Sequence, residues 1–386
     1  MTTRTATPAT FVKMLANVRS GDTLVLAPGN YGALALSNKY FADDVTIKGG
    51  TFTSVTFAKV SGVTLDGTTV IFTPTANSTS NSQAIRIWGS DDISILNAKV
   101  TGGESVNGVV KSATKLDASG NVLGLPVGKG INIDSSSDIV ISDSVISKFA
   151  KGITFSDVTN LTISDNQIHS LRTTPISGSG HDGLTITGNH TWNSSPWNYG
   201  GTGDHGDRIH LWTDDRPWTN VVISGNLLTQ GAGAPMMGIY LDDNLKGFGF
   251  PDVLISGNTV IDGNGQGMRL ENVSGMVVDN ELIWSGTGRA HNDTPRFQIA
   301  DNVHDVTFLN NIGNVAIQKT AHDLDFINQI GTFTKGAGLS LAAQQSIHIG
   351  KVPQSAFADT GDHNFAGFDL TGQAITMTVT NLHAFA

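Results

Sequence analysis

The sequence has 386 residues, of which 45 are Gly and none is Cys, and its formal net charge is −10. Only 15% of the residues are charged, compared with about 25% in a typical soluble domain, while the 39% hydrophobic content is enough for a core. The negative net charge and the lack of a run of basic residues argue against nucleic-acid binding. The missing Cys excludes disulfides and thiolate chemistry, and no apolar stretch reaches the length of a membrane span.

Residues 1–21 predict an N-terminal cap. Phe11, Met14, Leu15 and Val18 recur at helical spacing, which indicates a short capping helix. Residues 1–20 lack the basic-then-apolar layout of a signal peptide. Short apolar strands from Asp22 onward would open the first coil of a repeat structure, whose end the helix would cover.

A repeat of 22 or 23 residues dominates the middle of the chain, as from Ile131 to Ile153 to Ile176. Each unit has two short strands with apolar residues at alternate positions, followed by a small polar residue: Ser144, Asn166, Asn189, Asn226 and Asn258. Such units bury their apolar sides only when they are stacked, and stacked Asn can bond one another and the backbone. The pattern predicts an all-β fold, namely a single-stranded parallel β-helix, which is a solenoid. We expect it to be right-handed because connections between parallel strands are almost always right-handed. It extends over residues 22–335, and residues 336–386 are expected to form a C-terminal cap or oligomerisation segment.

The outward residues of the first strand in each coil suggest a site. Alternation turns His210, Tyr240 and Arg269 outward from three successive coils, so they should form one row. Acidic and basic residues flank this row. The candidate catalytic residues are His210, Tyr240, Arg269, Asp242, Glu271, Arg208 and Asp207.

Inserted loops surround the same coils, because the repeat lengthens to 33 residues between Ile176 and Ile209. These loops are rich in aromatic residues, which can stack on sugar rings, and loops on a rigid scaffold are where function is expected. The candidate substrate-binding residues are Trp192, Trp197, Tyr199, Trp212, Trp218, His205 and Arg296.

The His- and Asp-rich segment could instead form a metal site. His181, His205 and nearby Asp side chains could bind a divalent cation such as calcium. Neither an HExxH motif nor a calcium-loop signature is present. We therefore predict no metal and no cofactor, and expect the His181–Asp182 segment to be held by local His–Asp bonding.

Two segments carry a family resemblance. Gly21–Gly32 resembles the first coil of many pectate-lyase-like β-helix proteins, and Gly203–Thr213, with Ser179–Gly183 before it, resembles a pattern in β-helix proteins of bacteria and their phages. The resemblance covers roughly residues 10–335. It implies a right-handed parallel β-helix of the pectate-lyase-like superfamily, which contains polysaccharide lyases, glycoside hydrolases, epimerases and phage tailspikes.

The resemblance and the outward residues together favour an enzyme that depolymerises an acidic bacterial extracellular or capsular polysaccharide. The leading prediction is a polysaccharide lyase that acts by β-elimination at a uronate, and a glycoside hydrolase is the alternative. In a lyase, Arg269 would neutralise the uronate carboxylate while Tyr240 and His210 transfer protons. In a glycoside hydrolase of tailspike type, Asp242 and Glu271 would be the paired carboxyl groups. The same pattern is also compatible with an epimerase and with a non-catalytic glycan-binding β-helix. The expected location is extracellular or on a phage virion, where a tailspike would be a homotrimer.

Overall fold

The structure is a computed structural model that describes residues 1–104, 125–197, 204–243, 247–285, 294–318, 320–335 and 346–349, together with two strands further on. It divides into two units. The first contains Met1–Leu211 and Thr229–Ala234, and the second contains Trp212–Leu228 and Pro235–Ala386.

The first unit is built almost entirely of strands. Its elements are β1 (Thr3–Ala6), α1 (Phe11–Ala16), β2 (Thr23–Leu26), β3 (Ala33–Lys48), β4 (Thr51–Phe52), β5 (Ser54–Asp66), β6 (Thr69–Ile71), β7 (Gln83–Trp88), β8 (Asp91–Leu96), β9 (Lys99–Thr101), β10 (Lys129–Ser142), β11 (Val145–Ser147), β12 (Lys151–Ser164), β13 (Gln167–His169), β14 (Ile176–Thr187), β15 (His190–Trp192) and most of β16 (Asp207–Trp212).

The second unit continues the pattern of short strands. Its elements are β17 (Thr219–Ser224), most of β18 (Leu227–Thr229), β19 (Met237–Asp242), β20 (Phe250–Ser256), β21 (Thr259–Asp262), β22 (Gln266–Leu270), β23 (Val273–Val278), β24 (Glu281–Trp284), β25 (Arg296–Ile299), β26 (His304–Leu309), β27 (Asn314–Ile317), β28 (His322–Ile327), β29 (Phe333–Lys335), β30 (Ile347–Ile349), β31 (His363–Phe368) and β32 (Ala374–Val379).

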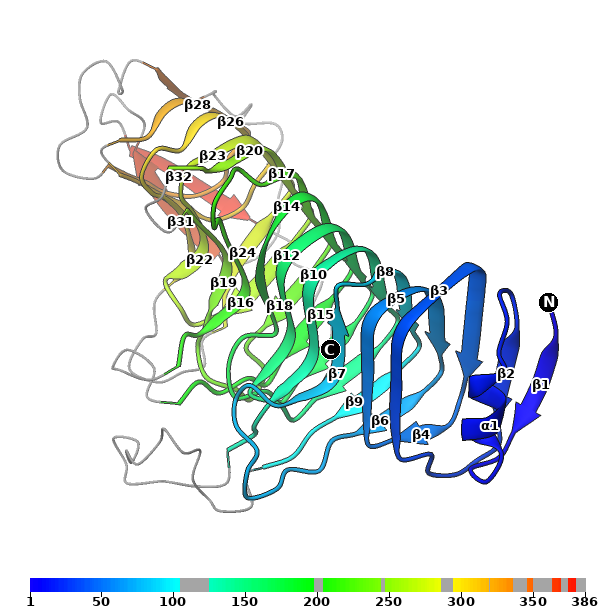
Figure 1. Cartoon of the computed structure of the whole chain (residues 1–386). Helices are drawn as coiled ribbons and strands as arrows, with labels where there is room; N and C mark the ends of the chain where they lie inside the picture. Colours follow the sequence, from blue (N-terminus) through cyan, green and yellow to red (C-terminus); the bar gives the residue numbers. More distant parts are fainter. Residues whose placement is uncertain are drawn as a thin grey trace. The chain divides into compact units, whose positions relative to one another are not determined.

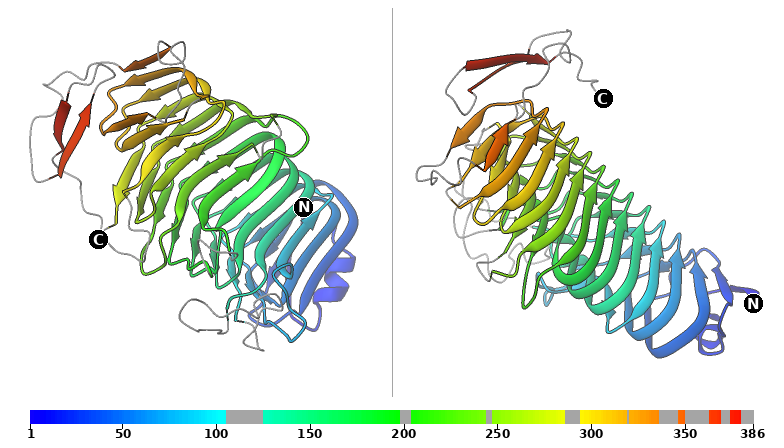
Figure 2. Two further views of the ribbon diagram at one scale, coloured as in Figure 1. Left: turned by 90° about the vertical axis from the view of Figure 1, so that its left-hand side faces the viewer. Right: turned by 90° about the horizontal axis from the view of Figure 1, so that it is seen from above.

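Parallel pairing between successive coils confirms the predicted β-helix. Ile131, Ile153 and Ile176 are register partners on β10, β12 and β14, and all three are fully buried. These strands lie side by side in Figure 1, and Figure 2 shows the same stacking from two other sides. In the second unit β20, β23, β26 and β28 pair in the same parallel way. Alternation of apolar and polar residues therefore fixes which side of each strand faces the core.

The predicted Asn column is a continuous hydrogen-bonded ladder within each unit. In the first unit Asn166 donates from its backbone N–H and from Nδ2 to Oδ1 of Asn189, at 3.0 and 2.9 Å. In the second unit Asn226, Asn258 and Asn280 each make the same pair of bonds to the next Asn along. The ladder satisfies buried backbone groups at a turn where no sheet partner is present.

A left-handed residue precedes each rung of this ladder. Asp165 before Asn166 has φ 56°, and Gly257 before Asn258 has φ 61°. Only Gly, Asn and Asp adopt this conformation readily, so the repeat draws on these residue types at every coil. This requirement explains part of the high Gly content of the chain.

The N-terminal cap is larger than the predicted helix. The helix α1 places the buried Phe11 ring 5.1 Å from Tyr31 and 5.8 Å from Phe52, centroid to centroid, and so covers the first coil. The strand β1, which the sequence did not predict, pairs in parallel with β2. Beyond residue 335, β31 and β32 pair antiparallel. The predicted domain limits and the role of residues 336–386 stay predictions.

We expect Asn258→Ala to lower the free energy of unfolding by roughly 3 kcal/mol, because it removes the bonds of a fully buried amide to Asn226, Asn280 and the Ile223 carbonyl. Urea unfolding followed by circular dichroism measures this loss. The matched control is Asn81→Ala, at an exposed position, which should change stability by less than ~0.5 kcal/mol. Equal effects of the two substitutions would contradict a stabilising role of the ladder.

Candidate active site

In the second unit, β19 and β22 bring Tyr240 and Arg269 together. The two residues are register partners, flanked by the buried pairs Ile239–Met268 and Leu241–Leu270. The inward side chains are fixed by the core, so Tyr240 and Arg269 must project outward. The Arg269 guanidinium carbon lies 5.5 Å from the centre of the Tyr240 ring. This part of the predicted row is present.

Glu271 joins this pair one residue after β22. Arg269 donates from Nε to Oε1 of Glu271 at 2.8 Å, and its Nη2 contacts the same oxygen. The Tyr240 hydroxyl lies 3.3 Å from that oxygen, and Glu271 donates its backbone N–H to the Leu241 carbonyl at 3.0 Å, which places it beside Asp242. Tyr240, Asp242, Arg269 and Glu271 thus form one cluster, here called the carboxyl-pair cluster. Its Arg269 is already bound to a carboxylate of the protein, which differs from the predicted role as a free neutraliser of a uronate.

Burial and charge set the protonation states in the carboxyl-pair cluster. Burial raises the pKa of Glu271, and the nearby Asp242 raises it further, against the opposite effect of Arg269. Burial also raises the pKa of the Tyr240 phenol, as do the charges of Glu271 and Asp242. Burial lowers the pKa of Arg269, but the bond to Glu271, the charge of Glu271 and the contact with Tyr240 together outweigh this and leave the pKa raised. The cluster therefore favours a protonated Tyr240 and a carboxyl pair that holds on to a proton.

In the first unit, β16 carries a second acid–base pair. The Asp207 carboxylate is completely buried, and its Oδ2 lies 3.2 Å from Nδ1 of His210, which is 15% exposed. His205 is 79% exposed, with its Nδ1 4.0 Å from the same oxygen and its ring 6.3 Å from that of His210. A carboxylate behind Nδ1 orients a histidine and favours a proton on that nitrogen. The predicted neighbourhood of His210 with Tyr240 and Arg269, which belong to the second unit, stays a prediction.

Arg208 is not exposed to solvent at the predicted outward position. Its side chain is completely buried, although alternation from Ile209 places it outward. A neighbouring buried ion pair was not predicted either: Arg172 donates from Nε and Nη2 to the two carboxylate oxygens of Asp204 at 2.7 and 2.8 Å. Asp204 also accepts from the Trp197 backbone N–H at 2.9 Å. The only sequence signal for this pair was the density of charge around Asp204.

Two further polar residues of the second unit have structural partners. Arg296, on β25, is half-buried and donates from Nε to the Gly265 carbonyl at 3.1 Å. Asp243 accepts bonds from the Thr213 hydroxyl and from the backbone N–H groups of Gly247 and Gly249. The Asp243 carboxylate therefore organises its own loop.

The predicted aromatic residues separate into different environments. Trp218 is completely buried against Phe250, so its prediction as a sugar platform is wrong. Trp192 is half-buried and stacks on His169 and His190, at ring-centre distances of 4.4 and 4.3 Å. The remaining aromatic residues of the prediction are Trp197, which packs on Val127, Trp212, which is half-buried, and Tyr199, which lies outside the described residues.

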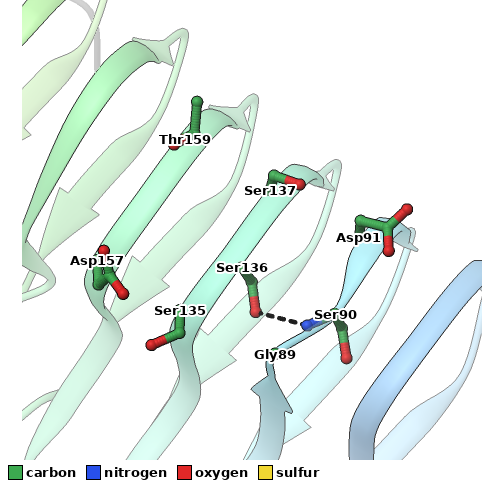
Figure 3. Close-up of a pocket in the computed structure, with 8 residues that line it drawn as sticks. All are labelled: Gly89, Ser90, Asp91, Ser135, Ser136, Ser137, Asp157 and Thr159. Carbon is green, nitrogen blue, oxygen red and sulfur yellow. Dashed lines mark hydrogen bonds between the residues drawn. The ribbon is translucent and has the colours of Figure 1, made fainter. Parts of the chain in front are cut away.

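A polar hollow lies elsewhere in the first unit, at the corner where consecutive coils turn (Figure 3). Hydroxyl groups and two carboxylates line it, and the Ser90 backbone N–H donates to the Ser136 hydroxyl at 3.1 Å. Its carboxylates already have partners, because Asp157 lies 2.5 Å from Nε2 of His181 and Asp91 accepts from Ser61. His181 therefore bonds to Asp157 of the preceding coil. In the described ranges, no group of three or more His, Asp or Glu side chains is arranged to bind a metal ion.

Comparison with known proteins identifies the family. The family model described as "Right handed beta helix region" matches residues 36–203 and 130–312, and the chain belongs to this family. The fold is thus a right-handed parallel β-helix, in agreement with the superfamily resemblance. No curated protein sequence matches the chain. Among the helices that the structure describes, none is long and apolar enough to cross a membrane.

Solved structures similar to this chain include three with different activities. The surface adhesin PfbA of Streptococcus pneumoniae is 12% identical, with a TM-score of 0.49 over 98% of this chain and 89% of that one. A polygalacturonase from Erwinia carotovora is 16% identical, with a TM-score of 0.49 over 91% and 96%. A variant of the periplasmic alginate epimerase AlgG is 13% identical, with a TM-score of 0.43 over 86% and 76%. At these identities the likeness concerns the fold.

We expect Trp218→Ala to lower the free energy of unfolding by about 3–5 kcal/mol, because it leaves a cavity where a completely buried ring packs on Phe250. The matched control is Trp284→Ala, in the same unit, whose side chain is 52% exposed and which should cost less than ~1 kcal/mol. Thermal and urea unfolding measure both variants. A small loss for Trp218→Ala would show that this ring is not a core residue.

Proposed function

We propose that the protein is a carbohydrate-active enzyme that hydrolyses glycosidic bonds of a bacterial extracellular or capsular polysaccharide. The observation that carries this proposal is the pair of carboxyl residues Asp242 and Glu271 on adjacent coils of the second unit, where the charge of Asp242 acts on Glu271. Glycoside hydrolysis needs two carboxyl groups, one to protonate the leaving oxygen and one to attack or to activate water. A β-helix presents such a pair on a rigid sheet face.

The environment of the pair supports distinct roles for its two members. Glu271 has a raised pKa and is the general acid that protonates the glycosidic oxygen. Asp242 is the partner carboxylate. Equivalent residues of adjacent coils are about 4.8 Å apart, which is nearer to the ~5–5.5 Å carboxyl separation of retaining enzymes than to the ~6.5–9.5 Å of inverting enzymes, so Asp242 would act as the nucleophile. Arg269 holds Glu271 in place and limits the charge of the pair.

A polysaccharide lyase is the second candidate, favoured by the Asp207–His210 pair. Asp207 Oδ2 lies 3.2 Å from Nδ1 of His210, and His210 would be the base that removes the proton at C5 of a uronate. In the structure Nε2 of His210 is buried, which argues against this role. The raised pKa of Tyr240 argues against a phenolate base at that position. The expected extracellular or virion location and the homotrimer stay predictions, as do an epimerase activity and a non-catalytic glycan-binding role.

We expect Glu271→Gln and Asp242→Asn each to reduce kcat by ~10²–10⁴-fold, because each removes a group that transfers a proton or bonds to the sugar in the transition state. A panel of bacterial exopolysaccharides, followed by the release of reducing ends, identifies a substrate for this measurement. The control variants are Glu281→Gln and Asp279→Asn, on other positions of the same unit. Wild-type activity should decline as pH rises through the raised pKa of Glu271, since the acid then loses its proton. Full activity of both site variants would refute the proposal.

Ultraviolet absorbance of the products separates hydrolysis from elimination. Hydrolysis yields a reducing end without a new double bond, whereas a lyase also creates an unsaturated uronate that absorbs in the ultraviolet. We expect reducing ends without this absorbance, and at most a ~10-fold loss of activity in His210→Ala. Absorbing products together with complete inactivation by His210→Ala would favour the lyase. Binding of a polymer without any cleavage would favour the non-catalytic glycan-binding role.

A further inference from the structure

Two lysine side chains lie next to each other in the first unit. Lys129, at the start of β10, and Lys151, at the start of β12, are register partners on adjacent parallel strands. Their backbones are therefore about 4.8 Å apart, and both side chains are half-buried. Arg86, on β7, adds a third cation on this sheet as the register partner of Asn132. Neither lysine belongs to the sites predicted from the sequence.

Lys129 is bonded to an amide and not to a carboxylate. Its Nζ donates to Oδ1 of Asn132 at 2.8 Å. The nearby Asp134 is occupied by two other donors, since Asn132 Nδ2 lies 2.6 Å and the Ser156 hydroxyl 2.7 Å from its carboxylate oxygens. Among the residues that the structure describes, the positive charge of Lys129 therefore has no counter-ion in direct contact.

The Lys151 ammonium group has a similar environment to that of Lys129. The acids that act on it electrostatically are Asp204 and Asp207, which form their close pairs with Arg172 and His210. Within the described ranges, the Lys151 ammonium makes no hydrogen bond or ion pair. Burial lowers the pKa of Lys151, and the charge of Lys129 lowers it further. Burial lowers the pKa of Lys129 as well.

Two lysines on neighbouring strands, both partly withdrawn from water and without a carboxylate in contact in the described part of the chain, are unfavourable in the free protein. An anionic ligand in contact with both would reduce this cost. We propose that Lys129 and Lys151 form a binding site for the carboxylate of a uronosyl residue of the polysaccharide, separate from the carboxyl-pair cluster. The inference rests on the proposed function only in taking a polysaccharide as the ligand.

Binding of defined oligosaccharides tests the site without turnover. The probes are oligogalacturonate, oligomannuronate and oligoglucuronate, each with its carboxyl-reduced neutral counterpart, titrated calorimetrically into the Glu271→Gln protein. We expect at least one uronate to bind, with Kd raised ~10-fold or more by Lys151→Met and by Lys129→Met. Lys99→Met, at an exposed position of the same unit, should leave Kd unchanged, and the neutral oligosaccharides should not distinguish the variants. Absence of uronate binding, or equal Kd values in all variants, would overturn the inference.

The stability of the free protein gives a second readout. Without ligand, Lys151→Met should raise Tm by about 2–4 °C, because an apolar side chain of similar length replaces an ammonium group that no described carboxylate contacts. If Lys151 had a purely structural role, the Lys151→Met substitution would lower Tm instead. Uronate binding without cleavage of any polymer would contradict the proposed function and leave this site intact. Cleavage of a polymer, with a Kd that neither lysine substitution changes, would support the proposed function and contradict the lysine site.

Discussion

The stacking of coils in one register is the constraint on which the rest of the molecule depends. Each coil must turn at the same place as its neighbours, and the buried Asn side chains fix that place by bonding to the next coil through backbone and amide together. The left-handed residue before each Asn completes the turn. Once these turns are aligned, the apolar residues of the strands fall into columns and form a core without any helix layer.

The candidate site is a direct product of this register. Tyr240 and Arg269 meet because β19 and β22 are paired residue by residue, and the same pairing leaves Asp242 and Glu271 on neighbouring coils. The backbone holds the two carboxyl groups close together on a partly covered sheet face. Burial raises the pKa of Glu271, and the charge of Asp242 raises it further.

The periodicity of the sequence predicts which strand residues face the core and which residues pair between coils. It does not predict which outward residues are buried by other segments. The buried columns through Ile131, the Asn ladder and the pairing of Tyr240 with Arg269 all follow from spacing. The burial of Arg208 and Trp218 does not, because it depends on how segments outside the regular strands fold over the sheets. The pairing of Lys129 with Lys151 follows from the 22-residue spacing as well, but their partial burial without a contacting carboxylate among the described residues does not.

The strand β1 has a consequence for the behaviour of the protein in concentrated solution. A parallel β-helix ends in a coil whose backbone groups and core would otherwise be open to another chain, as at the edge of any sheet. Here β1 pairs along β2, Phe11 of α1 covers the first coil, and the Tyr31 hydroxyl bonds to the Ala6 and Ala27 carbonyls. The N-terminal segment therefore protects the first coil against end-to-end aggregation, and its removal would turn the solenoid into a template for fibre growth.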